Sequence, residues 1–267
     1  MSYQPIENYG IIGNMRTVAL VGMNGSIDWY CSPHFDSPSI FGAILDDEKG
    51  GRFQISADSD GVRHKQFYWP STNVLVTRFL LADGIAELED FMPVRLPSDS
   101  PEYRHVYRRI RCVRGAVRIS VACRPAFDYG RQTHNTLIEA NGATFKSRSL
   151  TLTLSTAVPL RNDGRGGVSA EFVLSEGESQ VFILRDDCRE GEVPCPPSEK
   201  DAERLLQRTV KFWQDWLSSC TYHGRWRDQV HRSALALKLL TFEPTGAIIA
   251  APTTSLPEVI GGARNWD

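Results

Sequence analysis

The residues best suited to chemistry in this sequence are Asn265, Trp266 and Asp267, which follow the paired glycines 261 and 262. A tryptophan face can stack on a sugar ring, and asparagine and aspartate can hydrogen-bond to neighbouring hydroxyls. We therefore predict that these three residues contribute to the binding of a neutral polyol substrate. The alternative is that Trp266 is a structural residue in a loop.

Five aspartates could supply the acids of a glycosidic reaction, which needs one carboxyl group with a raised pKa and one with an ordinary pKa. They are Asp28, Asp36, Asp46, Asp90 and Asp128. Nothing in their spacing brings two of them together, and the first three lie at or beside predicted turns. We therefore predict that they make turn and loop hydrogen bonds, and we propose no catalytic residue.

Motifs for other chemistries are missing from the sequence. The six histidines show no HExxH or other metal-ligand spacing, and there is no GxSxG motif. The glycine-rich stretch 164–167 lacks the lysine and the strand-to-helix context of a phosphate loop. The six cysteines form no CxxC pair and are predicted to be free thiols. We therefore predict neither a metal ion nor another cofactor.

The stretch 103–118 is rich in arginine and contains two tyrosines, so it could contact nucleic acid. Its arginines alternate with apolar residues, however, and Glu87, Glu89 and Asp90 lie on a preceding predicted strand as cross-strand partners. The whole chain has 30 basic and 32 acidic residues. We therefore predict a solvated, ion-paired sheet face, with neither nucleic acid nor a membrane as a partner.

The composition is that of an ordinary soluble globular protein, with 41% hydrophobic and 23% charged residues. The N-terminus has no signal-peptide pattern, and no apolar run is long enough to span a bilayer. These features predict a cytoplasmic location.

The elements that must position the candidate residues are mostly strands. A hairpin is predicted from 17–21 and 26–31, which flank a turn with an Asn-Gly pair. The pattern continues in short, β-branched or alternating segments, which favour a large antiparallel sandwich. The further predicted strands are 41–45, 51–56, 67–69, 74–81, 85–92, 103–113, 116–123, 136–139, 150–154, 168–174 and 180–184.

The pattern changes to helical after a proline-rich stretch at 194–197. Ser198 with Asp201 is a helix-start signature, and apolar spacing predicts an amphipathic helix over 201–219. A second helix is predicted over 226–242, with an apolar stripe formed by Trp226, Val230, Ala234, Leu237 and Leu240.

Four segments resemble landmarks of bacterial glycoside hydrolase family 15, the glucoamylase-like and trehalase-like proteins. The first is the opening from residue 6 to residue 53, which includes NGSIDWYCSPHFDSPSIFG. The others are CRPAFDYGR at 123–131, RSALALKLLTFEPTGAIIAAPTTSLPE at 232–258 and GGARNWD at 261–267. They follow one another in the order expected for that family.

The resemblance implies a β super-sandwich over 1–197, a helical linker over 198–224, and the start of a truncated six-hairpin α/α barrel over 225–267. It implies a parent enzyme that hydrolyses a neutral α-glucoside, either gluco-oligosaccharides or trehalose, with inversion. The catalytic glutamates of the family would lie in the missing barrel, so the 267-residue chain is expected to be inactive alone. Asn265, Trp266 and Asp267 match the front edge of the substrate-binding motif.

A rival interpretation is a self-contained module that binds carbohydrate or another partner through exposed aromatic side chains. Under the first interpretation, the apolar stripe of 226–240 loses its cover, which could lead to a homo-oligomer. The sequence leaves both possibilities open.

Overall fold

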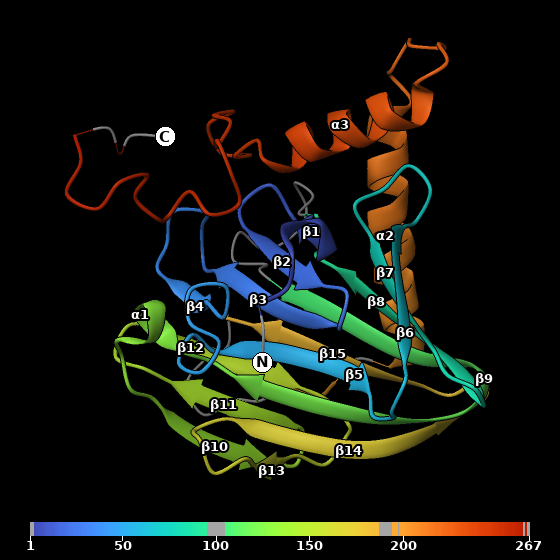
Figure 1. The fold of residues 1–267 in the computed structure, drawn as a ribbon, viewed down its shortest axis with the longest axis vertical. Helices are drawn as coiled ribbons and strands as arrows, with labels where there is room; N and C mark the ends of the chain where they lie inside the picture. The colour runs from blue at the N-terminus through green and yellow to red at the C-terminus, as the bar shows by residue number, and fades with distance from the viewer. Residues whose placement is uncertain (1–2, 95–104, 187–193, 197, 264, 266–267) are drawn as a thin grey trace.

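The computed structural model describes residues 3–94, 105–186, 194–196, 198–263 and 265. They form a large antiparallel β-sandwich with two long helices at one side (Figure 1). The fifteen strands of the described chain belong to one hydrogen-bonded network. The prediction of a mainly β, antiparallel sandwich followed by helices is therefore confirmed, while the assignment of the second helix to a barrel stays a prediction.

One strand, β9, connects the two layers of the sandwich and runs for 20 residues, His105–Arg124. Its first half pairs with β8 and β15 and its second half with β5 and β14. The bounds of these four strands are Gly84–Phe91, Ser179–Arg185, Arg52–Ala57 and Val168–Ser175. The prediction of two strands, 103–113 and 116–123, was wrong, because Gly115 bends the strand with a φ of 72° yet still pairs with Gly84.

The first layer runs in the order β1, β2, β3, β5, β9, with β4 beside β3 and β13 beside β14. The strands not yet given are β1 (Tyr9–Gly13), β2 (Val18–Gly22), β3 (Ser26–Cys31), β4 (Ser39–Phe41) and β13 (Arg161–Asn162). The predicted hairpin is confirmed as β2 and β3, and Gly25 in its turn has a φ of 76°.

The second layer runs in the order β6, β7, β8, β9, β15, β12, β11, β10. Its remaining strands are β6 (Arg63–Tyr68), β7 (Leu75–Leu80), β10 (Asn135–Glu139), β11 (Gly142–Lys146) and β12 (Thr151–Ser155). The core lies between the two layers, where Phe53 of β5 and Phe182 of β15 meet with ring centroids 6.4 Å apart.

Three strands, β1, β11 and β13, are not predicted from the sequence, and the predicted strand 41–45 was wrong beyond Phe41, because residues 43–45 form a turn. In β1 the cause is Gly10 and Gly13, since glycine disfavours strands. Packing explains the glycine at position 10, because a Cβ there would lie 2.6 Å from Leu75 Cδ2. The close contact with β7 requires a glycine at position 10, so β1 forms although glycine disfavours strands.

The arginines of β9 form ion pairs with the acids of β8, as predicted. Arg109 lies 3.4 Å from Glu89, and Arg111 lies 2.5 Å from Glu87. The prediction that this face is solvated was wrong, because the side chains of Glu87, Glu89 and Arg109 are only 5%, 2% and 12% exposed. On the opposite face of β9, Arg108 is fully buried and pairs with the equally buried Asp90 at 2.8 Å.

The carboxylate of Glu87 gives the sandwich a pH-dependent stability. Burial favours its neutral form, but the hydrogen bonds and charges of Arg111 and Arg78 outweigh burial, so the pKa of Glu87 lies below its ordinary value. A lowered folded-state pKa adds stability that is fully present above the unfolded-state pKa and is lost as the pH falls through the folded-state value.

We therefore expect Glu87→Gln to lose less stability than the wild-type chain when the pH is lowered from about 5 to about 3, a range that starts above the ordinary glutamate pKa and ends below it. Urea unfolding at a series of pH values measures this difference. Glu171→Gln, at an exposed position on β14, is the matched control and should keep the wild-type pH dependence. If Glu87→Gln and the wild type lose the same amount of stability when the pH is lowered, the prediction is contradicted.

The first long helix, α2 (Glu199–Leu217), begins after Ser198, whose hydroxyl accepts a hydrogen bond from Asp201 N at 3.2 Å. The predicted helix 201–219 is thus confirmed with its ends moved by two residues. Its apolar face packs on β15 and neighbouring strands through a buried cluster that includes Ala202, Leu206 and Val210.

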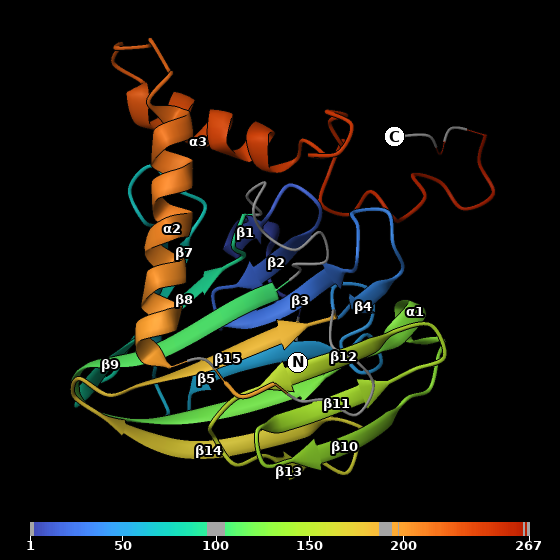
Figure 2. The same ribbon diagram turned by 180° about the vertical axis from the view of Figure 1, so that it is seen from behind.

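The second helix, α3 (Arg227–Leu239), crosses above the ends of β1 and β2 (Figure 2). Its buried residues are Leu235 and Leu239, whereas Trp226 and Leu237 are 55% and 58% exposed. The predicted stripe was therefore wrong at Trp226, which precedes the helix, and at Leu237, whereas Ala234 and Leu240 do pack against the apolar cluster that contains Leu235 and Leu239. None of the helices in the described residues has the length and apolar character needed to cross a membrane.

Candidate functional site

The segment after α3 lies across the ends of the N-terminal strands (Figures 1 and 2). Glu243 N donates to Met15 O at 2.8 Å, and the Glu243 carboxylate pairs with Arg16 at 2.6 Å. Phe242 N donates to Ala247 O at 2.7 Å, which closes a tight turn. The turn brings residues 247–250 against the loop between β3 and β4.

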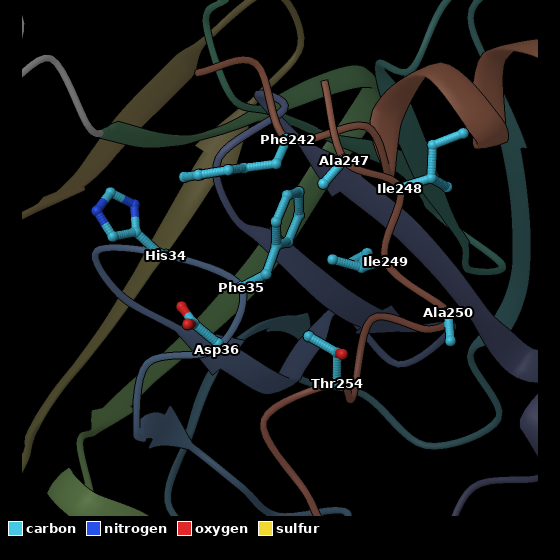
Figure 3. Close-up of a pocket in the computed structure, with 9 residues that line it drawn as sticks. All are labelled: His34, Phe35, Asp36, Phe242, Ala247, Ile248, Ile249, Ala250 and Thr254. Carbon is cyan, nitrogen blue, oxygen red and sulfur yellow. The ribbon is translucent and has the colours of Figure 1, made fainter. Parts of the chain in front are cut away.

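These two segments enclose a cavity of about 550 Å³. Figure 3 shows His34 and Asp36 on one side of the cavity and Ile248, Ile249 and Ala250 on the other. Phe35, Phe242, Ala247 and Thr254 complete its lining. A largely apolar wall with a few polar groups is typical of a small-molecule pocket.

Aromatic contacts hold the cavity wall in place. The ring of Phe242 meets the ring of His34 at 5.4 Å and the ring of Phe35 at 6.0 Å, both edge to face. Asp36 is the one acid among the described residues that line the cavity. A glycosidic reaction with inversion requires two acids, so this cavity can contribute binding but not the complete reaction.

The predicted turn aspartates differ in their environment. Asp46 accepts hydrogen bonds from Lys49 N and Glu48 N, which lower its pKa, so its predicted turn role is confirmed. For Asp28 the prediction was wrong, because this residue lies within β3 and is 5% exposed. Its carboxylate accepts hydrogen bonds from Tyr9 Oη at 2.8 Å and Ser26 Oγ at 2.5 Å.

The other aspartates are also far from forming a carboxylate pair. Asp90 is bound by Arg108, and Asp128 pairs with Arg131 at 2.6 Å. No group of three or more potential metal ligands occurs in the part of the chain that the structure describes.

The described cysteines are free thiols, as predicted, whereas Cys188 lies outside the described residues. Burial raises the pKa of Cys31 to about 12, an effect that the hydrogen bond with Ser255 reduces only in part. The Cys31 thiol therefore stays protonated and is a poor nucleophile.

Of the predicted substrate-binding residues, only Asn265 can be placed, because Trp266 and Asp267 lie outside the described residues. The Asn265 amide donates to Val259 O at 3.0 Å and to Gly262 O at 2.9 Å, and its oxygen accepts from Val259 N at 3.1 Å. In this conformation the side chain closes its own turn, so a contact with substrate stays a prediction.

The structure adds residues that the sequence does not single out. Trp29 Nε1 donates to Pro252 O at 2.8 Å, and Tyr129 Oη donates to Ser255 O at 3.1 Å. The only sequence signal is the pair of prolines at 252 and 257, which predicts an extended or looped segment but not what it contacts.

The fold and the cavity define a β-sandwich domain with a helical extension and a largely apolar cavity beside the loop between β3 and β4. The chain belongs to the family described as trehalase-like, N-terminal, whose model matches residues 1–203.

Among similar proteins is a trehalase of Thermoplasma volcanium, 38% identical over 274 residues that cover 99% of this chain and 42% of that protein. A trehalase of Thermoplasma acidophilum is 38% identical and covers 93% of this chain and 42% of that protein. A trehalase of Mycolicibacterium smegmatis is 33% identical and covers 99% of this chain and 42% of that protein. The chain thus spans about 42% of the length of the curated relatives it matches.

Proposed function

We propose that this chain is the N-terminal sandwich portion of a glycoside hydrolase of family 15 that acts on α-glucosides, with trehalose as the first substrate to test. The observation that carries the proposal is the 33% to 38% identity to three trehalases over nearly all of this chain. Because the chain spans 42% of those proteins, we propose that a longer protein carries the remainder of the enzyme.

The proposed reaction is hydrolysis with inversion, in which one carboxylic acid protonates the leaving oxygen and a carboxylate activates a water. We propose that both groups come from an α/α barrel in the same protein, which begins near residue 225. The sandwich would then brace the barrel, with α2 as its linker. We propose that the cavity beside Asp36 and the segment that leads to Asn265 face that barrel.

The rival proposal, a self-contained carbohydrate-binding module, requires exposed aromatic side chains that form a platform. Trp29 and Trp213 are fully buried, and Trp69 and Trp216 pack against apolar clusters. Trp226 is 55% exposed, but it stands in the loop between the helices with Arg225 over its ring. None of the tryptophans in the described residues therefore provides such a platform.

The test compares the 267-residue chain with the whole protein that contains it, using trehalose, maltose and, as a β-linked control, cellobiose. We expect the whole protein to hydrolyse an α-linked substrate and the 267-residue chain to be inactive. For trehalose, proton NMR at early times should show α- and β-glucose in equal amounts, because inversion makes β-glucose from the attacked ring while the other ring leaves as α-glucose. A whole protein inert on every α-glucoside would refute the enzymatic proposal, and hydrolysis by the shorter chain would refute its inactivity.

A further inference from the structure

Three side chains, two from β3 and one from the turn that follows β9, contact the turn segment 252–255. The Trp29 indole donates to the carbonyl of Pro252, and the Tyr129 hydroxyl donates to the carbonyl of Ser255. The thiol of Cys31 lies 3.4 Å from the Ser255 hydroxyl. The Trp29 and Tyr129 rings are 6.4 Å apart, so both donors belong to one cluster.

Tyr129 reaches this segment from an uncommon backbone conformation. It has φ 57° and ψ 34°, and the preceding Asp128 has φ 54° and ψ 52°. Two successive non-glycine residues in the left-handed region cost free energy, and such strain persists only where surrounding contacts hold it. Here Arg131 pairs with the Asp128 carboxylate at 2.6 Å, and its guanidinium lies 5.3 Å from the centre of the Tyr129 ring.

The 252–255 segment has little regular structure of its own. Thr254 N donates to Ala251 O at 3.1 Å and Leu256 N donates to Thr253 O at 2.9 Å, which are turn bonds within the segment. Pro252 has no N–H to pair with a strand. The path of the 252–255 segment over the sandwich is therefore set by the side chains that contact it, rather than by backbone hydrogen bonds to a neighbouring strand.

We propose that Tyr129 is a positioning residue that, together with Trp29, fixes the 252–255 segment on the sandwich and so directs the chain toward Asn265. The contacts themselves stand on the structure alone. Their effect on catalysis rests on the proposed function, because the predicted substrate-binding residues begin at Asn265. The hydroxyl of Tyr129 acts on the segment and not on the sandwich core, and its side chain is only partly buried.

Two variants in the whole protein test the proposal at different strengths. Tyr129→Phe removes the hydroxyl but keeps the ring, whereas Tyr129→Asn removes the ring and suits the left-handed backbone, which asparagine tolerates. With Tyr129→Phe we expect amide exchange in residues 253–256 to rise about five-fold, the effect of losing one ordinary hydrogen bond. The rise should be larger with Tyr129→Asn, and the Trp29 indole N–H resonance should shift in both variants.

The matched control is Tyr222→Phe, which removes a hydroxyl from the loop between α2 and α3, where it accepts a hydrogen bond from Trp226 N at 3.4 Å. This variant should leave exchange in residues 253–256 and the Trp29 signal unchanged. Unchanged exchange in both Tyr129 variants would overturn the proposal.

Trehalose hydrolysis by the whole protein provides a separate measurement. We expect kcat/KM to fall in the order wild type, Tyr129→Phe, Tyr129→Asn, with a loss of about ten-fold in the last, because displaced binding groups lower the rate. If exchange rises but kcat/KM does not change, the positioning effect on catalysis is overturned. If the wild-type protein cleaves no α-glucoside, the proposed function fails, while the exchange and indole measurements still decide whether Tyr129 fixes the segment.

Discussion

Replacing Arg108 by methionine is expected to lower the free energy of unfolding by about 3–5 kcal/mol, the range for removing one partner of a buried ion pair. The Arg108 and Asp90 side chains are both 0% exposed, and Arg108 Nε lies 2.8 Å from Asp90 Oδ1. The Arg108 guanidinium also donates to the backbone carbonyls of Phe53 and Gly25. Methionine fills much of the same space but leaves the Asp90 carboxylate without its donor and removes one hydrogen bond from each of the two carbonyls, of which Gly25 O keeps the bond from Ile55 N at 3.1 Å.

Thermal unfolding followed by circular dichroism measures this loss, which should lower the midpoint by about 10 °C for a domain of this size. Arg118→Met is the matched control, because Arg118 is exposed on the same strand. Its effect should stay within about 0.5 kcal/mol, as is usual for surface changes.

A second variant distinguishes the lost ion pair from poor packing. Adding Asp90→Leu to Arg108→Met removes the unpaired carboxylate, and the double variant should recover part of the lost stability. If the double variant is less stable than Arg108→Met by about another 3–5 kcal/mol, the unpaired carboxylate is not the source of the lost stability.

The sequence predicts the sandwich because strand signals depend on neighbours along the chain. Alternation of arginines with apolar residues identifies the strand that became β9, and the acids on the preceding strand are correctly paired with it. What alternation cannot reveal is which face lies inside. Arg108 points into the core because Asp90 and two carbonyls meet it there, and these partners come from three other strands or turns.

The candidate site was less predictable for the same reason. Its cavity joins the loop 34–36 to residues 242–254, which are about two hundred positions away in the sequence. Asp28 resembles a turn residue because it follows an Asn-Gly turn closely, yet the hydroxyls of Tyr9 and Ser26 allow a carboxylate to lie within a buried strand. No spacing rule connects Tyr129 with Ser255, because the contact depends on the left-handed residues Asp128 and Tyr129 in the short element α1 (Phe127–Gly130), which follows β9.

The junction between the sandwich and the helices depends most on Trp213 of α2. Its side chain is 0% exposed and belongs to an apolar cluster with Leu235 and Leu239 of α3 and with Met15 and Val18 near the β1–β2 turn. Trp213→Ala should cost about 3–5 kcal/mol, since it removes a large buried side chain and leaves a cavity. Hydrogen exchange should show the greatest loss of protection in α3, whose buried contacts lie in this cluster.

The matched control is Trp226→Ala, because Trp226 is 55% exposed in the loop between the two helices. This variant should change stability by less than about 0.5 kcal/mol. The sandwich core between the two layers is a separate cluster from the one around Trp213. Protection in β9 and β15 should therefore survive in Trp213→Ala, and a loss of equal size in α3 and in these strands would contradict the assignment of Trp213 to the junction.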